Sequence, residues 1–101
     1  MIDIELAGKA LDDLDRILDH LLTPGVTDAG LRAAAIVSAL DVLAEHPLIG
    51  RPEANGLREL VIGRDSRGYV ALYRHDPARE RVLVLAVRGQ REAGCGPAIG
   101  E

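Results

Sequence analysis

Residues 57–89 decide the fold, because LRELVIGRDSRGYVALYRHDPARERVLVLAVRG alternates between β-forming runs and turn residues. Three segments are rich in valine, leucine, isoleucine and tyrosine: Leu57–Gly63, Gly68–Arg74 and Arg81–Gly89. The turns between them are of hairpin length, which predicts that the three strands are antiparallel neighbours.

The faces of these strands follow from their alternation, since successive side chains of a strand point to opposite sides. Tyr69, Ala71 and Tyr73 are predicted to share one face of the middle strand. The last strand is apolar at every position from 82 to 87. This pattern predicts a strand that is covered on both faces or lies centrally in the sheet.

Two helices are predicted ahead of the strands. From Lys9 to Leu22 the apolar residues fall at helical spacing, and the opposite face carries polar residues: Asp12, Asp13, Asp15, Arg16 and Asp19. A second helix is expected at about Ala29–Glu45, capped by Thr27 or Asp28. It has to end near His46, because the residue before a proline disfavours helical geometry.

The order of elements predicts an α+β fold, β-α-α-β-β-β, with a helical hairpin packed on one face of a small twisted antiparallel sheet. The alternating segment Ile2–Leu6 is either the first strand or a lead-in to the helix. Residues 1–95 are expected to form a single domain, and residues 96–101 a flexible tail.

Composition excludes several classes of function. With one cysteine and three scattered histidines among 101 residues, the chain has no zinc pattern and no internal disulfide. It has no glycine motif for nucleotides and no apolar run of membrane-spanning length. We therefore expect a cytoplasmic protein without a metal, a cofactor or a membrane partner.

Charge is unevenly distributed along the chain. The first fifty residues hold nine acids and three bases, whereas the rest holds seven acids and nine bases, all of them arginine. Arginine suits planar recognition of carboxylate or phosphate groups. The partner is therefore expected on the sheet and its loops.

Several segments together resemble the RelE/ParE superfamily, the toxins of bacterial type II toxin–antitoxin pairs. They are ALDDLDRI (Ala10–Ile17), HPLIGRP (His46–Pro52), GLREL (Gly56–Leu60), GYVALYR (Gly68–Arg74) and RGQREAG (Arg88–Gly94). The resemblance implies a growth-inhibiting toxin linked to plasmid stabilization, and a hetero-oligomer with a cognate antitoxin that wraps around it.

The two branches of this superfamily imply different targets. RelE-like members resemble ribosome-dependent mRNA endonucleases, which need basic side chains near the scissile phosphate. ParE-like members resemble inhibitors of DNA gyrase, which bind a protein and need no catalytic set. A third alternative is a toxin-like interaction domain that is not toxic.

A comparison with the ribonuclease pattern favours the ParE-like branch. Where RelE-like nucleases place cations, this chain has Leu60, Ile62 and Val70, and Cys95 stands nearest to their tail tyrosine. Arg91 alone matches, and it is the catalytic candidate if the chain is a nuclease. The Gly50–Pro52 loop also resembles ParE-like members.

Seven residues are predicted to bind the target or the antitoxin: Arg51, Arg58, Tyr69, Tyr73, Arg88, Gln90 and Arg91. Each has a structural alternative. Arg51 is either a binding residue or a clamp on loop carbonyls. Arg58 and Arg91 are equally explained by ion pairs with acids, and the two tyrosines by the core of a chain that lacks phenylalanine.

Overall fold

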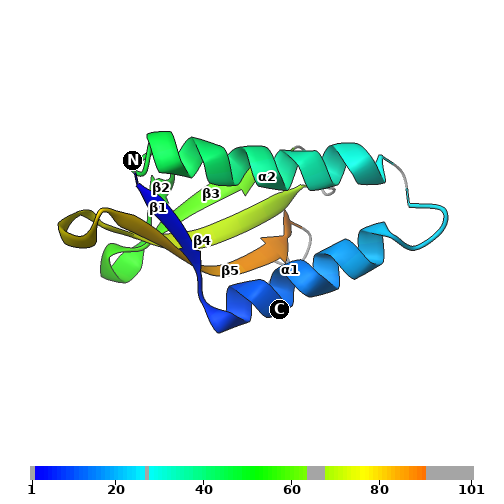
Figure 1. Cartoon of the computed structure of the whole chain (residues 1–101), viewed down its shortest axis with the longest axis horizontal. Helices are drawn as coiled ribbons and strands as arrows, with labels where there is room; N and C mark the ends of the chain where they lie inside the picture. The colour runs from blue at the N-terminus through cyan, green and yellow to red at the C-terminus, as the bar shows by residue number, and fades with distance from the viewer. Residues whose placement is uncertain (1, 27, 64–67, 91–101) are drawn as a thin grey trace.

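The computed structural model describes residues 2–26, 28–63 and 68–90. Two helices pack against a five-stranded sheet (Figure 1). The elements are β1 (Asp3–Leu6), α1 (Gly8–Leu21), α2 (Ala29–Glu45), β2 (Arg51–Pro52), β3 (Arg58–Ile62), β4 (Tyr69–Asp76) and β5 (Arg81–Gly89). Arg91, Cys95 and the predicted flexible tail lie outside the described residues.

The sheet has the strand order β1-β5-β4-β3-β2. The hairpins β3–β4 and β4–β5 are antiparallel, as the turn lengths predict. β5 lies between β1 and β4, so the central position that its apolar sequence suggested is confirmed. The sheet as a whole is mixed, because β1 pairs with β5 in the parallel sense, with Ile4 opposite Val82.

The predicted loop after α2 contains one further short strand. β2 pairs antiparallel with β3, with Arg51 opposite Glu59. This pairing places Arg51 on the same face as Glu59, away from the helices. A two-residue strand carries too little periodicity to be predicted from sequence.

The two helices run antiparallel along the sheet (Figure 1). Helix α2 ends at Glu45, one residue before His46, as the following proline predicts. Asp28 precedes α2 in a left-handed conformation, with φ of 57°, and its side chain makes no capping hydrogen bond. In the part of the chain that the structure describes, no helix is long and apolar enough to span a membrane.

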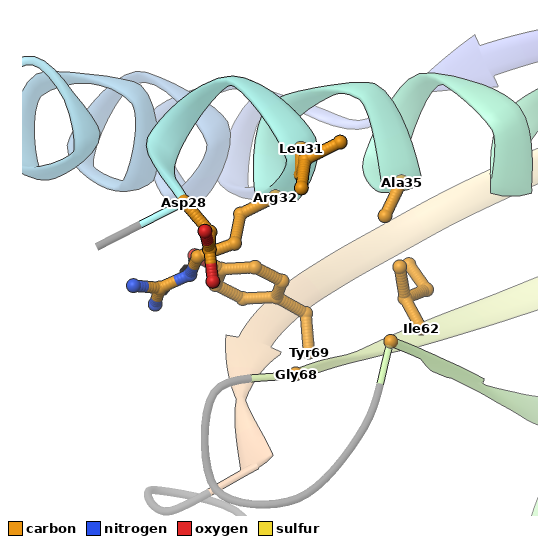
Figure 2. Close-up of a pocket in the computed structure, with 8 residues that line it drawn as sticks. Asp28, Leu31, Arg32, Ala35, Ile62, Gly68 and Tyr69 are labelled. Atoms are coloured by element: carbon orange, nitrogen blue, oxygen red, sulfur yellow. Dashed lines mark hydrogen bonds between the residues drawn. The ribbon is translucent and has the colours of Figure 1, made fainter. Parts of the chain in front are cut away.

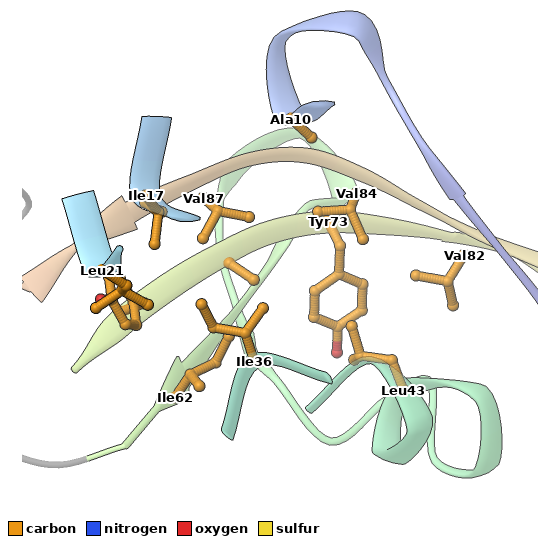
Figure 3. Close-up of a cluster of buried hydrophobic side chains, with 12 residues drawn as sticks. Ala10, Ile17, Leu21, Ile36, Leu43, Ile62, Tyr73, Val82, Val84 and Val87 are labelled. Carbon is orange, nitrogen blue, oxygen red and sulfur yellow. The ribbon is translucent and has the colours of Figure 1, made fainter. Parts of the chain in front are cut away.

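The core lies between the helices and one face of the sheet. The buried face of β4 carries Tyr69, Ala71 and Tyr73, so the predicted alternation is confirmed. Figure 3 shows the Tyr73 ring among Val82, Val84 and Leu43. The opposite face of the sheet is called the open face below; its residues on β3 and β4 include Glu59, Val61, Val70 and Leu72.

Candidate functional site

The predicted site residues divide between the two ends of the sheet. Register places Arg58 opposite Tyr73 at one end and Tyr69 opposite Gly89 at the other. The two tyrosines are four residues apart on β4, which is roughly 13 Å at about 3.3 Å per residue. The first end groups Arg51, Arg58 and Tyr73, and the second groups Tyr69, Arg88 and Gln90.

At the first end, Tyr73 supports the loop between α2 and β2. Its ring is fully buried, and its hydroxyl oxygen accepts a hydrogen bond of 2.8 Å from the Gly50 N–H. A Cβ atom at Gly50 would lie 2.6 Å from that oxygen and 3.0 Å from the Glu59 carbonyl oxygen. Only glycine fits here, because the Tyr73 hydroxyl that accepts the Gly50 hydrogen bond leaves no room for a side chain at residue 50.

Arg58 fastens the same loop. Its Nη1 donates hydrogen bonds to the carbonyl oxygens of Leu48, at 3.1 Å, and Gly50, at 2.8 Å. Arg58 therefore has the clamping role that the sequence suggested for Arg51. The ion pair between Arg58 and a helix acid, which was its alternative, is not formed with any described residue.

Arg51 lies on the open face, where its side chain is 73% exposed. Its Nη2 lies 2.7 Å from Glu59 Oε1, and its Nε lies 3.4 Å from Glu53 Oε2. Exposed pairs of this kind contribute roughly 0–1 kcal/mol to stability. A partner carboxylate can therefore compete for Arg51 at little expense to the fold.

The loop borders a cavity of about 570 Å³. Its lining residues are Glu45, His46, Pro47, Leu48, Ile49 and His75. Leu48 and Ile49 are 58% and 52% exposed. The cavity wall is therefore largely apolar and accessible from solvent.

At the second end, Tyr69 lies under the first turns of α2 (Figure 2). Arg32 Nη2 donates to the Tyr69 hydroxyl oxygen at 3.1 Å, and the Arg32 guanidinium carbon lies 5.7 Å from the ring centroid. This geometry combines a hydrogen bond with a cation–π contact. The two residues border a pocket of about 420 Å³ that also contains Leu31, Ala35 and Ile62.

Arg88 and Gln90 lie at the end of β5. The Gln90 N–H donates to the Gly68 carbonyl oxygen at 2.9 Å, which extends the pairing of β4 and β5 by one bond. Arg88 is exposed and lies opposite Val70 in the register, on the open face. It forms no hydrogen bond or ion pair with the described residues, so its charge is available to a partner.

Asp13 was predicted to lie on the exposed face of its helix, and this prediction is wrong. The residue is 3% exposed. Its Oδ2 accepts a hydrogen bond of 3.0 Å from the Val87 N–H, beyond the point where β1 stops covering β5. Lys9 Nζ lies 3.0 Å from the same carboxylate.

The carboxylate of Asp13 has an altered acidity. Burial raises the pKa of Asp13, but the hydrogen bonds from Val87 and Lys9 and the charges of Lys9 and Arg16 outweigh burial and hold the pKa below its ordinary value of 3.8. The folded state therefore stabilises the ionised form of the Asp13 carboxylate. The sequence held one signal for this position, because Asp13 is three residues after the buried Ala10 and four before the buried Ile17.

The turn between β4 and β5 holds a second acidic group with lowered pKa. Hydrogen bonds from Arg79 hold the pKa of Asp76 below its ordinary value. Arg81 lies 2.9 Å from Glu5 and 3.5 Å from Asp76. Both arginines are thus engaged at this turn. No group of three potential metal ligands occurs within residues 2–26, 28–63 and 68–90.

Residues 4–94 match the family model described as the ParE toxin of the type II toxin–antitoxin system, parDE. Toxin RelE3 of Caulobacter vibrioides is 30% identical over 92 residues, which are 91% of this chain and 98% of that relative.

Solved structures agree with this match. The chromosomal ParDE system of P. aeruginosa contains a chain with a TM-score of 0.67 and 26% identity, over 88% of this chain and 96% of that one. The RelBE2 toxin–antitoxin complex of Mycobacterium tuberculosis gives a TM-score of 0.59 and 26% identity, over 87% and 90% of the two chains. This chain therefore belongs to the ParE family of the RelE/ParE superfamily and is a toxin of a type II toxin–antitoxin system.

Proposed function

We propose that this toxin arrests bacterial growth by binding DNA gyrase in the cytoplasm, and that a cognate antitoxin neutralises it in a hetero-oligomer. The observation that carries the choice of gyrase is the character of the open face at β3 and β4. A nuclease needs cations there, and a protein-binding toxin does not.

Leu60 and Ile62 face the helices, because they lie opposite Ala71 and Tyr69 in the register. Ile62 is 3% exposed. A phosphate above this part of the open face would meet Glu59, Val61 and Val70 instead. Removing a single electrostatic contact to a transition state typically raises the barrier by about 3–4 kcal/mol. The middle of this face, at Val61 and Val70, is apolar, and Arg51 at its edge is already paired with Glu53 and Glu59. Arg88 beside Val70 is left to stabilise a phosphate, which is an unfavourable arrangement for cleavage of a phosphodiester.

The antitoxin is proposed to cover the apolar and arginine-bearing open face. Several solved relatives are described as toxin–antitoxin complexes, which supports a partner of this class. Val61 is 56% exposed on this face, and Arg88 has no partner among the described residues. An antitoxin segment with apolar side chains and a carboxylate would complement both.

A ribosome-dependent endonuclease is the second candidate. One observation favours it: Arg88 offers an unengaged cation on the open face, opposite Val70. The relative named Toxin RelE3 gives it a second, weaker support. In this case Arg88, together with the catalytic candidate Arg91, would stabilise the charge of the reacting phosphate.

Induction of the toxin in bacteria is expected to cause DNA damage and filamentation while transcripts stay intact. Primer extension on transcripts and a gyrase supercoiling assay with purified toxin are the measurements. Co-expression of the antitoxin is the control and should restore growth. Cleavages within codons that disappear in Arg88→Ala or Arg91→Ala would instead establish the nuclease. Normal colonies with abundant soluble toxin would indicate a non-toxic interaction domain.

A further inference from the structure

The loop from His46 to Gly50 holds two large apolar side chains out in solvent. Leu48 and Ile49 are 58% and 52% exposed, and they are adjacent in sequence. Single exposed apolar residues are common on protein surfaces. Leu48 and Ile49, however, are adjacent and both line an apolar cavity of about 570 Å³. Together they form a continuous exposed apolar surface, which is typical of a binding site.

The backbone on which these two side chains stand is rigidly held. Hydrogen bonds from Arg58 fix the carbonyl oxygens of Leu48 and Gly50, and the Gly50 N–H is bound to the buried Tyr73 hydroxyl. The Ile49 N–H also donates to the His46 carbonyl oxygen at 3.1 Å. A loop fixed in this way loses little conformational entropy when a partner binds, so its apolar contacts contribute more fully to affinity.

The surroundings of the loop are negatively charged. Asp41 and Glu45 lie in the last turns of α2, are exposed, and form no hydrogen bond or ion pair with the described residues. The C-terminus of a helix adds a partial negative charge, and the last turn of α2 contains no basic residue. The nearby Arg51 and Arg58 are already engaged with Glu53, Glu59 and backbone carbonyls.

We propose that the loop surface, defined by Glu45, Pro47, Leu48 and Ile49, docks the protein that the toxin poisons. Its occupant is a segment of that target with an aliphatic or aromatic side chain for the cavity and a lysine or arginine for Glu45 and the end of α2. The inference rests on the proposed function in one respect only: the toxin acts by binding a protein target.

The loop surface is distinct from the surface proposed for the antitoxin. Arg58 and Tyr73, which hold the loop, both belong to the helix-facing side of the sheet. The unengaged Arg88 belongs to the open face. An acidic, apolar loop and a face with a free arginine suit partners of opposite charge, so one partner is not expected to satisfy both.

The test compares the full-length toxin with the double variant Leu48→Ser/Ile49→Ser and with Glu45→Lys. We expect the toxin concentration for half-inhibition of purified gyrase to rise by about tenfold or more in the double variant, which corresponds to roughly 1.4 kcal/mol. Antitoxin affinity should stay within about twofold. The matched controls are Val37→Ser, an exposed apolar residue at 61% on α2, and Asp12→Lys on α1.

Every outcome decides the inference. Inhibition unchanged in both loop variants would overturn it, and so would a loss of antitoxin binding in place of target inhibition. If the wild-type toxin does not inhibit gyrase, the proposed target is wrong, and growth arrest becomes the readout for the loop. Loop variants that arrest growth as the wild type does would then overturn the inference, whereas lost arrest with intact antitoxin binding would support it.

Discussion

Replacing Gly50 by alanine is expected to lower the free energy of unfolding by about 1–3 kcal/mol, although it adds one methyl group. The added Cβ would lie 2.6 Å from the Tyr73 hydroxyl oxygen and 2.7 Å from its Cε1. Tyr73 is fully buried, so its ring cannot move aside as an exposed side chain would. Chemical denaturation measures this loss.

The control for this substitution is Gly30→Ala. Gly30 lies near the start of α2, and no heavy atom surrounds the position that a Cβ would take within 4 Å. Alanine is the better helix former by about 1 kcal/mol at an interior position, so this variant should be neutral or more stable. Equal destabilisation by both substitutions would contradict the close contact at Gly50.

Tyr73→Phe completes a double-mutant cycle with Gly50→Ala. Alone it leaves the buried Gly50 N–H without its acceptor, which costs about 1–3 kcal/mol. In the Tyr73→Phe background the nearest obstructing atom, the hydroxyl oxygen, is absent, although the contact with Cε1 remains. The clash is therefore partly relieved, and the two losses should be less than additive. Strict additivity would show that the Tyr73 hydroxyl and the new methyl group do not interact.

The strands were predictable because their information is local. Alternation in residues 69–73 placed both tyrosines on the buried face of β4, and short turns specified two antiparallel hairpins. The parallel pairing of β1 with β5 was not predictable in the same way. Its partners are about 78 residues apart, as for Ile4 and Val82, and no local pattern encodes that distance.

The roles of Arg51 and Arg58 show a second limit. One interpretation of the sequence was that Arg51 binds the backbone carbonyls of the loop. In the structure Arg58, seven residues later, makes these hydrogen bonds. Which of the two arginines reaches the loop depends on the face of the sheet on which its side chain lies. Arg58 shares a face with Tyr73 and reaches the loop, whereas Arg51 shares a face with Glu59 on the open side.

Asp13 was missed because its partner is a backbone group of another element. Its hydrogen bond joins residues 74 positions apart. An aspartate that directly follows another aspartate, in a helix with further acids at residues 15 and 19, is typical of a solvent-exposed helix face. Here β1 pairs with β5 only as far as Val84. Beyond that point the side chain of Asp13 takes the place of a neighbouring strand and accepts the hydrogen bond from the Val87 N–H.

Asp13→Leu is expected to lower the free energy of unfolding by about 2–4 kcal/mol at pH 7, since it removes a charged acceptor and leaves the buried Val87 N–H unsatisfied. Asp13→Asn keeps an acceptor for Val87 but loses the charge that attracts Lys9 and Arg16, so its loss should be smaller, at roughly 1–2 kcal/mol. Asp12→Asn on the exposed side of the same helix is the control and should change stability by less than about 0.5 kcal/mol.

The dependence on pH identifies the charge as the cause. Because the fold lowers the pKa of Asp13, its contribution is fully present above the ordinary value of 3.8 and is lost as the pH falls through the folded-state pKa. Denaturation curves between about pH 7 and pH 3 should therefore show the wild type and Asp13→Asn converging at low pH. A difference that stays constant over this range would mean that Asp13 contributes through shape alone, and that the edge of β5 is not held by a carboxylate.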